Sequence, residues 1–497
     1  MSPFKRHMPA MGLALIAFAC VAAILITPAL KGRADQTQPT QADQTRRPNI
    51  IFILTDDLAD NLVQYMPNLQ QMQKDGTTFS NYYVTDSLCC PSRSSIFTGK
   101  FPHDTHVLTN QPPLGGYQSF NAHGNQTQTF SVVLQHAGYK TAMLGKYLNG
   151  YQPGSDGVPP GWNEWDVAGN GYPEFNYALN ENGRVVQYGA EPKDYLTDVV
   201  SGIAQKFIRD SEPGPFFIEI ATFAPHAPYV PAPRDANAFP GLSAPRGPAF
   251  GARPGPNDPK WLQEIPPLNK PEIAKIDKFF RMRAQSVQAV DQMIGQIRTE
   301  LAQLGDNDTY IIFSSDNGYH MGEYSLRPGK MTPFDTDISV PLVVVGPNVA
   351  KGVVVHQVVE NVDLAETYTR IGGQAPPPQA DGHALLPLLL GGDVAEWRHV
   401  ALIEHKRPGP SITDPDAPIP HSADPVTYEA LRLDNAMYVE YEDGEVGYYD
   451  IARDPSELNN IAQGLTPAQH QRLHEILVAN QNCHGQQTCW AAQSMTP

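Results

Sequence analysis

The chain has 497 residues, of which 18% are charged and 41% hydrophobic, and its formal net charge at pH 7 is -17. This composition is typical of a globular protein and excludes disorder over the whole chain. The length leaves room for one large α/β domain and a smaller one. The acidic excess argues against nucleic acid as a partner, because binding to phosphates requires a basic face.

The N-terminal segment is typical of an export signal. Lys5 and Arg6 precede a long apolar stretch, in the order that secretory signals show. We expect residues 1–34 to be a signal peptide or an anchor, with residues 8–30 in the membrane in the second case. Residues 35–47 are polar and are expected to form a disordered spacer. The protein is therefore expected to be secreted, periplasmic or otherwise extracytoplasmic.

Short apolar runs that end in polar residues predict buried parallel strands. These runs span residues 50–54, 141–144, 216–221, 310–313 and 340–345. Between them, residues 130–137 and 279–304 have helical patterns that end at Gly138 and Gly305. The alternation indicates an α/β fold with a large, mostly parallel central sheet flanked by helices. Ligands of such sheets bind at the carboxyl ends of the strands.

The C-terminal part of the chain predicts a smaller α+β subdomain. The run Pro376-Pro377-Pro378 marks the end of the main domain, which we place at residues 48–378. Beyond it, short β-like runs such as residues 436–439 precede a helix expected at residues 467–480. We assign residues 379–497 to this subdomain.

Four of the five cysteines form two pairs that are close in sequence. Cys483 and Cys489 enclose a short polar loop, and in an exported protein this spacing is typical of a small structural disulfide. A metal site with His484 is the alternative, but the segment lacks a second ligand pair. Cys89 and Cys90 are adjacent, and a bridge between them would strain the backbone, so this pair requires another explanation.

The segment that begins at Cys89 predicts a helix. Pro91 suits the first turn and Gly99 suits the end. Cys89 would then lie at a helix N-terminus, where free N–H groups and the helix dipole favour an anion. Arg93 adds a fixed cationic fork about one turn later. On these residues alone, a buried cysteine pair at the start of a structural helix explains the segment equally well.

Two polar pairs follow predicted strands. Asp56 and Asp57 end the first strand, and Asp316 and Asn317 end a later one, so four hard oxygen ligands could converge. Oxygen ligands without His or Cys favour calcium or magnesium over zinc. A single pair would favour helix caps or solvated turns, whereas two pairs together with the Cys89 segment favour a metal site.

Three further candidates are cationic: Lys146 at a strand end, His226 in a proline-rich segment, and Lys330. Taken singly, such residues are more often surface lysines or satisfied histidines. With Arg93 and a divalent ion, they would form a local positive pocket within an acidic protein.

The run Cys89-Cys90-Pro91-Ser92-Arg93, followed by Thr98-Gly99, resembles the type I sulfatase signature Cys-x-Pro-Ser-Arg with Thr-Gly. The resemblance extends from about Arg47 to Trp490 and is to the N-acetylglucosamine-6-sulfatase branch. Its other segments are Gly145-Lys146-Tyr147-Leu148-Asn149, Ser315-Asp316-Asn317-Gly318-Tyr319-His320 and Tyr449-Asp450-Ile451-Ala452-Arg453-Asp454-Pro455. The chain departs from the family at Leu148, where many sulfatases carry a histidine. The implied fold is the alkaline-phosphatase-like sandwich.

The resemblance also implies a mechanism and a ligand set. Cys89, not Cys90, would be oxidised to formylglycine (3-oxoalanine) by a formylglycine-generating enzyme, and its hydrate would attack sulfur. One Ca²⁺, rather than Mg²⁺, would be held by Asp56, Asp57, Asp316, Asn317 and the modified Cys89. The implied catalytic contacts are Arg93, Lys146 and Lys330 to sulfate, and His226 as proton donor to the leaving alcohol. Asn149 and His320 are expected to bind substrate.

Three functions are compatible with these residues. The first is a sulfatase that acts on a sulfated small molecule or glycan, such as N-acetylglucosamine-6-sulfate or a glycosaminoglycan. The second is a phosphodiester or phosphonate monoester hydrolase of the same superfamily, since sulfate and phosphate esters differ mainly in charge. The third is a non-catalytic binding protein in which Cys89 stays a thiol. The complete set of ligand and cationic positions argues against the third.

Overall fold

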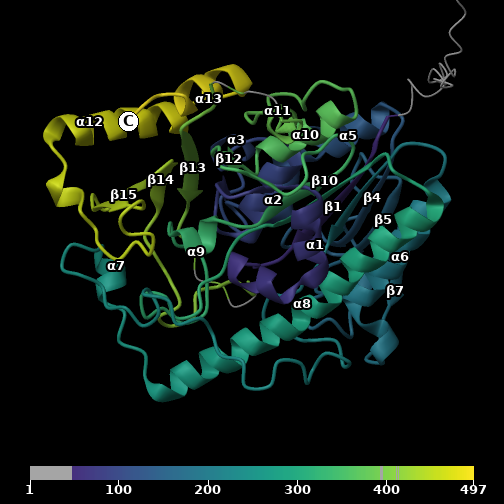
Figure 1. Ribbon diagram of the computed structural model, residues 1–497, viewed down its shortest axis with the longest axis horizontal. Coiled ribbons are helices and arrows are strands. Elements are labelled where there is room, and N and C mark those ends of the chain that lie inside the picture. The colour runs from purple at the N-terminus through teal and green to yellow at the C-terminus, as the bar shows by residue number, and fades with distance from the viewer. Residues whose placement is uncertain (1–46, 392–393, 395, 410, 412–413) are drawn as a thin grey trace, which may run out of the picture. The chain divides into compact units, whose positions relative to one another are not determined.

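The computed structural model describes residues 47–391, 394, 396–409, 411 and 414–497 (Figure 1). The expected signal peptide or anchor and nearly all of the expected spacer therefore lie outside the described residues. Within the described ranges, no helix combines the length and the apolar character that a membrane crossing requires.

A sheet of ten strands forms the centre of the large domain, in the order β11-β2-β10-β9-β1-β8-β4-β5-β6-β7. The strands are β1 (Asn49–Thr55), β2 (Thr77–Phe79), β4 (Lys140–Lys146), β5 (Glu164–Ala168), β6 (Ala178–Glu181), β7 (Arg184–Gln187), β8 (Phe216–Ala221), β9 (Thr309–Ser315), β10 (Leu342–Val345) and β11 (Val353–Val355). The five middle strands, from β9 to β5, are parallel. A small parallel pair, β3 (Tyr82–Tyr83) and β12 (Val359–Glu360), forms a separate sheet.

The direction of the strand at residues 340–345 was predicted wrongly. β10 runs antiparallel to both β9 and β2, so the sheet is mixed rather than uniformly parallel. Parallel neighbours need a long crossover, usually a helix. Between β9 and β10 there is only the four-residue α9 (Asp335–Ile338). The apolar run correctly indicated a buried strand, but it carries no information about direction.

Helices cover both faces of the sheet, and alternate side chains of β1 show the two layers. Ile51 and Ile53 pack in one hydrophobic cluster with Phe280 of the long helix α8. Phe52 and Leu54 pack in the other. The first layer consists of η1 (Asp60–Tyr65), α1 (Pro67–Asp75), α6 (Leu196–Ser211) and α8 (Lys270–Leu304), and Figure 1 shows α8 lying along α6. The second includes α2 (Cys89–Thr98), α5 (Phe130–His136) and α10 (Asp363–Ile371).

The helix α8 begins nine residues before the predicted start at residue 279, at Lys270. Asn269 and Glu272 form a capping box, in which each side chain accepts a hydrogen bond from the other residue's N–H. This cap fixes the start of the helix in a stretch whose apolar periodicity is weak.

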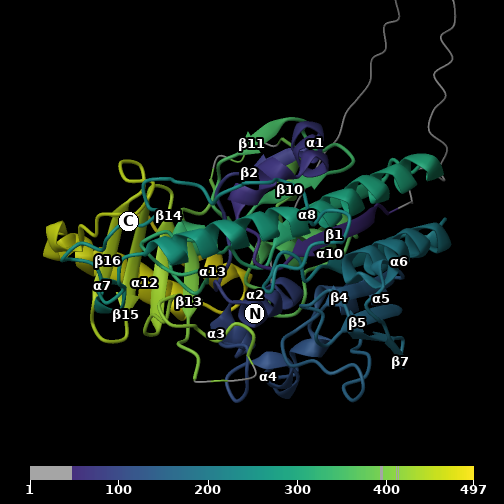
Figure 2. The ribbon, with the colours of Figure 1, turned by 90° about the horizontal axis from the view of Figure 1, so that it is seen from below.

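The predicted C-terminal subdomain contains a four-stranded antiparallel sheet covered by two helices, as Figure 2 shows. Its elements are β13 (Val400–His405), β14 (Tyr428–Leu433), β15 (Ala436–Tyr441), β16 (Val446–Asp450), α12 (Pro467–Gln481) and α13 (Gln486–Gln493). Leu402, Tyr438 and Ile476 share its hydrophobic core. The α/β fold with a smaller C-terminal subdomain is therefore confirmed, whereas the boundary at residue 378 stays a prediction.

The remaining short helices lie in the connections. They are α3 (Pro102–Thr105), α4 (Gly116–Ala122), η2 (Asn125–Thr127), η3 (Pro192–Asp194), α7 (Lys260–Gln263), α11 (Leu386–Leu389) and η4 (Ala462–Gly464).

Candidate active site

The carboxyl ends of β1 and β9 bring the two predicted polar pairs together. The parallel register places Thr55 opposite Ser315, so the residues that follow each strand are neighbours. The Asp57 N–H donates to Oδ1 of Asp316 (3.2 Å), and Nδ2 of Asn317 donates to Oδ1 of Asp57 (2.7 Å). Asp56 is equally buried beside them. Four oxygen-bearing side chains therefore meet at one edge of the sheet.

Cys89 is the first residue of α2 and faces these carboxylates. Its thiol donates to Oδ1 of Asp56 (3.2 Å) and accepts a hydrogen bond from Nζ of Lys330 (2.8 Å). Burial, followed by the nearby carboxylates, raises the pKa of the Cys89 thiol well above its usual range. Cys90 points elsewhere: it belongs to the hydrophobic core, and its N–H donates to Oδ1 of Asn110 (2.9 Å). The two cysteines therefore lie in different surroundings, Cys89 among the charged side chains and Cys90 in the core.

Buried cations pair with the carboxylates. The pairs are Arg93 Nε with Asp316 Oδ2 (2.7 Å), Lys146 Nζ with Asp56 Oδ2 (2.5 Å) and Lys330 Nζ with Asp57 Oδ1 (2.6 Å). Burial opposes the ionisation of Asp316. The positive charges of Arg93 and Lys146 outweigh this effect and lower the pKa of Asp316 to about 2. These contacts gather three cationic side chains from three separate segments around Cys89.

A glycine places Lys146 at the end of β4. Gly145 has φ +86°, and a Cβ there would lie 2.0 Å from the carbonyl oxygen of Ala221. Only glycine can therefore stand at this contact between β4 and β8, which precedes the lysine directly. The Lys146 ammonium also lies 5.1 Å from the centre of the Tyr172 ring, a cation–π contact.

His226 lies in the segment that follows β8 and is buried. Its Nδ1 faces the carbonyl oxygen of Ala227 (2.7 Å), and its Nε2 faces Oδ1 of Asp416 (2.7 Å) and Oδ2 of Asp57 (3.6 Å). Burial opposes the charged ring, but Asp57, Asp56 and Asp416 outweigh it and raise the pKa of His226 to about 9. Both ring nitrogens face acceptor oxygens, which suits an imidazole that donates a proton.

Residues 48–373 match the family model described as Sulfatase. The chain belongs to the sulfatase family. It is a sulfuric ester hydrolase, as the sequence predicted. Residues 322–482 also match the model described as N-sulphoglucosamine sulphohydrolase, C-terminal, which spans much of the smaller subdomain.

Named relatives of this sulfatase cover nearly the whole chain. The N-acetylglucosamine-6-sulfatase of Capra hircus is 36% identical over 92% of this chain and 87% of its own length. The N-acetylglucosamine-6-sulfatase of Homo sapiens is also 36% identical, over 89% and 86% of the two chains.

Solved structures share the fold of this sulfatase at lower identity. One, described as a complex with its substrate D-glucosamine-2-N,6-O-disulfate, has a TM-score of 0.74 and 23% identity, covering 88% of this chain and 98% of the other. The phosphonate monoester hydrolase of Agrobacterium radiobacter has a TM-score of 0.66 and 21% identity, covering 87% and 95%. The same fold therefore occurs in a protein whose substrate carries sulfate groups and in a phosphonate monoester hydrolase.

The residues of the sulfatase site fit a divalent cation. Sulfatases generally use a metal ion with a cysteine-derived formylglycine. Oδ2 of Asp57 and Oδ1 of Asn317 are buried and have no hydrogen-bond partner among the described residues. One ligand atom from each of Asp56, Asp57, Cys89 and His226 lies within 4.8 Å of the others. Because the carboxylate and amide donors are hard oxygens, the set suits calcium or magnesium.

Two hollows open beside the sulfatase site. One has a volume of about 580 Å³ and is bounded by Asp57, His226 and Lys330, together with the rings of Tyr229, Phe279 and Tyr319. The other, of about 770 Å³, is lined by Asn149, Tyr172 and Asp414. Residues Ala227, Pro228 and Pro415 line both, so they form the ridge between the hollows.

The two residues expected to bind substrate differ in their surroundings. Asn149 lines the second hollow, and its Oδ1 is buried without a hydrogen-bond partner in the described structure. His320 instead has both ring nitrogens engaged, Nδ1 with Asp337 (2.9 Å) and Nε2 with the carbonyl oxygen of Ser422 (2.9 Å). His320 therefore joins two loops and does not line either hollow.

Asp416 is a site residue that the sequence analysis missed. Its carboxylate contacts His226 and Lys330 (2.7 Å each) through Oδ1, and accepts from Nδ2 of Asn110 (2.7 Å) through Oδ2. Although burial opposes the charge, Lys330 and His226 hold the pKa of Asp416 well below its usual range. Asp416 lies in a proline-rich segment between β13 and β14, and this segment brings its carboxylate into the site.

Proposed function

We propose that this sulfatase hydrolyses the 6-sulfate of an N-acetylglucosamine or glucosamine residue, with a formylglycine made from Cys89 and a bound Ca²⁺. The observation that carries the proposal is the convergence of Cys89, a hard-oxygen cluster and three buried cations at one sheet edge. A tetrahedral anion requires such a set, because several donors must hold its oxygens while one group attacks.

Each side chain has a role in this proposal. The formylglycine hydrate, once formed, supplies a hydroxyl nucleophile in place of the thiol. The metal ion, when bound by Asp56, Asp57, Asp316 and Asn317, supplies positive charge for the sulfate group. Arg93 holds Asp316 in place through its Nε, while Lys146 and Lys330 bring their ammonium groups to the sulfate oxygens.

His226 is the proposed proton donor to the leaving sugar alcohol. It borders the first hollow, where the rest of the substrate would lie, and it is held by a carbonyl oxygen at Nδ1. An alcohol leaves more readily when it receives a proton as the bond to sulfur breaks. A proton-bearing Nε2 next to that hollow suits this step.

The substrate class rests on the relatives and on the lining of the first hollow. Two relatives that are 36% identical are named N-acetylglucosamine-6-sulfatase. The rings of Tyr229, Phe279 and Tyr319 border the hollow, and aromatic faces pack well against the apolar face of a sugar ring. Asn149 in the second hollow is the proposed contact for a further polar group of the glycan.

The proposal also includes an extracytoplasmic location and a maturation partner. The disulfide between Cys483 and Cys489 suits an oxidising compartment. The generating enzyme would have to act on the segment before it folds, because Cys89 and Arg93 are fully buried.

A comparison of substrates tests the proposal. We expect sulfate release from N-acetylglucosamine-6-sulfate with a kcat/KM at least about tenfold above that for an aryl sulfate. A phosphodiester and a phosphonate monoester, tested in parallel, should be poorer substrates still. Activity confined to the phosphorus esters would replace the proposal by the phosphonate or phosphodiester hydrolase function.

A further inference from the structure

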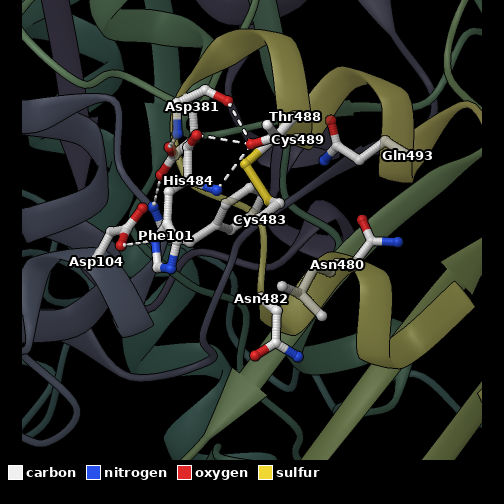
Figure 3. The surroundings of a disulfide bond; sticks show 12 residues. Phe101, Asp104, Asp381, Asn480, Asn482, Cys483, His484, Thr488, Cys489 and Gln493 are labelled. Atoms are coloured by element: carbon white, nitrogen blue, oxygen red, sulfur yellow. Dashed lines mark hydrogen bonds and ion pairs between the residues drawn. A yellow bond between two sulfur atoms is a disulfide. The ribbon is translucent and has the colours of Figure 1, made fainter.

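The C-terminal disulfide holds a histidine against the large domain. Cys483 and Cys489 close a loop between α12 and α13, and Figure 3 shows His484 of this loop beside Asp104. Nδ1 of His484 lies 2.5 Å from Oδ1 of Asp104, which belongs to α3 and is 380 residues earlier in the chain. No second pair of metal ligands lies near His484 in the sequence. In the fold, α3 brings the pair His103 and Asp104 close to it.

His103, which precedes Asp104 in the chain, is the third residue of this group. Nε2 of His103 lies 3.9 Å from Oδ2 of Asp104 and 2.9 Å from the carbonyl oxygen of Cys483. One ligand atom from each of His103, Asp104 and His484 lies within 4.8 Å of the others. Two imidazole nitrogens and a carboxylate oxygen therefore lie close together, and a backbone carbonyl oxygen contacts one of the imidazoles.

A further carboxylate orients His103. Oε1 of Glu404, on β13, lies 2.9 Å from Nδ1 of His103, and Oε2 accepts a hydrogen bond from the His103 backbone N–H (3.2 Å). This leaves Nε2 on the side of Asp104 and His484. Histidines that bind metals commonly have such a carboxylate on the second ring nitrogen, because it fixes the ring and makes the free nitrogen more basic.

We propose that His103, Asp104 and His484 form a second metal site, which binds Zn²⁺ or a similar borderline transition metal ion. Imidazole ligands favour these ions over calcium, which prefers oxygen alone. Ligands placed 2.0–2.1 Å from a tetrahedral zinc lie about 3.3 Å apart. Nδ1 of His484 lies 2.5 Å from one oxygen of Asp104 and Nε2 of His103 lies 3.9 Å from the other, so both pairs are near that spacing.

The position suggests what the ion would do. Its ligands come from α3 and from the loop between α12 and α13, so binding would tie the C-terminal helices to the large domain beside the disulfide. An ion that binds only the folded state stabilises it in proportion to the logarithm of its concentration. The site shares no residue with the cluster around Cys89.

The test is zinc binding to the full-length protein saturated with Ca²⁺, measured by isothermal titration calorimetry. We expect one high-affinity Zn²⁺ equivalent that His484→Ala weakens at least about tenfold, since one of three side-chain ligands is lost. Glu404→Gln should weaken binding by about 10- to 100-fold through the orientation of His103. The His484 side chain is 68% exposed, so its substitution leaves the core intact.

His474→Ala is the matched control. His474 is also an exposed histidine that pairs with a carboxylate, Glu440 (3.0 Å), and it lies on α12. It belongs to neither metal-ligand group found in the described residues, so its loss should leave zinc affinity unchanged. Equal affinities for the wild type and His484→Ala, or no zinc binding by the wild type, would overturn the proposal and leave the cluster as a set of ion pairs.

Discussion

The Nε2 atom of His226 lies 2.7 Å from Oδ1 of Asp416, although the two residues are 190 positions apart in the chain. His226 follows a strand of the large sheet, whereas Asp416 lies in the segment between β13 and β14. The predicted C-terminal subdomain therefore contributes a charged group to a site at the end of the large sheet.

The contact predicts that Asp416 positions the proton donor. Asp416→Asn keeps the shape of the side chain but removes the charge that holds His226 and Lys330. We expect kcat to fall by about 10- to 100-fold, with little change in Ca²⁺ affinity, since Asp416 is not one of the proposed ligands. An unchanged or higher kcat would show instead that the carboxylate competes with the substrate anion.

The two adjacent cysteines should differ sharply in their effects. Cys89→Ala removes the precursor of the nucleophile, and activity should fall by at least about a thousandfold. Cys90 packs in the hydrophobic core, so Cys90→Ala should cost about 1–2 kcal/mol of stability and leave turnover nearly unchanged. Equal losses of turnover in both variants, measured on folded protein, would contradict the assignment.

The metal cluster predicts a specific loss at Asn317. Its Oδ1 is one of the buried oxygens without a hydrogen-bond partner among the described residues, so Asn317→Ala should weaken Ca²⁺ binding by about 10- to 100-fold. Asn307→Ala is the control, because Asn307 lies just before β9 as Asn317 lies just after it. Chelation of Ca²⁺ should abolish wild-type activity, and Ca²⁺ should restore it better than Mg²⁺. Equal binding by the two variants would argue against Asn317 as a ligand.

The buried carboxyl of Glu174 predicts a pH dependence of stability. Burial outweighs the hydrogen bonds from Thr197 and raises the pKa of Glu174 from 4.5 to about 8. Between these values the unfolded chain is ionised while the folded protein keeps the proton, so this group's contribution to stability falls as pH rises.

Glu174→Gln removes this penalty. At pH 9 the variant should be more stable than the wild type by on the order of 3 kcal/mol, and at pH 5 the two should be nearly equal. Urea unfolding at both pH values measures the difference, and Glu264→Gln, at an exposed position, serves as the control. A gain of the same size at both pH values would show that the effect is not ionisation.

The site residues that the sequence could predict stand next to apolar runs or helix-start residues, which are visible in the sequence itself. Asp56, Asp57, Asp316 and Asn317 follow apolar runs, and parallel strands bring their ends together once the sheet forms. The start of α2 at Cys89 agrees with the helix signals of Pro91 and Gly99, because the helix ends with Gly99 in a left-handed conformation. These features depend on local chain preferences, so the sequence carries them.

The parts that were not predictable depend on packing between distant segments. Nothing near Asp416 marks it, because its contacts come from the way the segment between β13 and β14 lies over the large domain. His320 stands in a sulfatase-like motif, yet Asp337 and Ser422 occupy both its nitrogens. The start of α8 does have a local signal, because the capping residues Asn269 and Glu272 can be seen in the sequence. The apolar periodicity after them is weak, so the pattern predicts a later start, at residue 279.

The conversion of Cys89 is tested by the mass of the tryptic peptide Asp75–Arg93, taken from protein made in its native host. We expect an aldehyde at Cys89 and an ordinary thiol at Cys90, so only one cysteine would be alkylated and an aldehyde-reactive probe would label the peptide. Alkylation of both cysteines in catalytically active protein would show that Cys89 is not converted into the nucleophile.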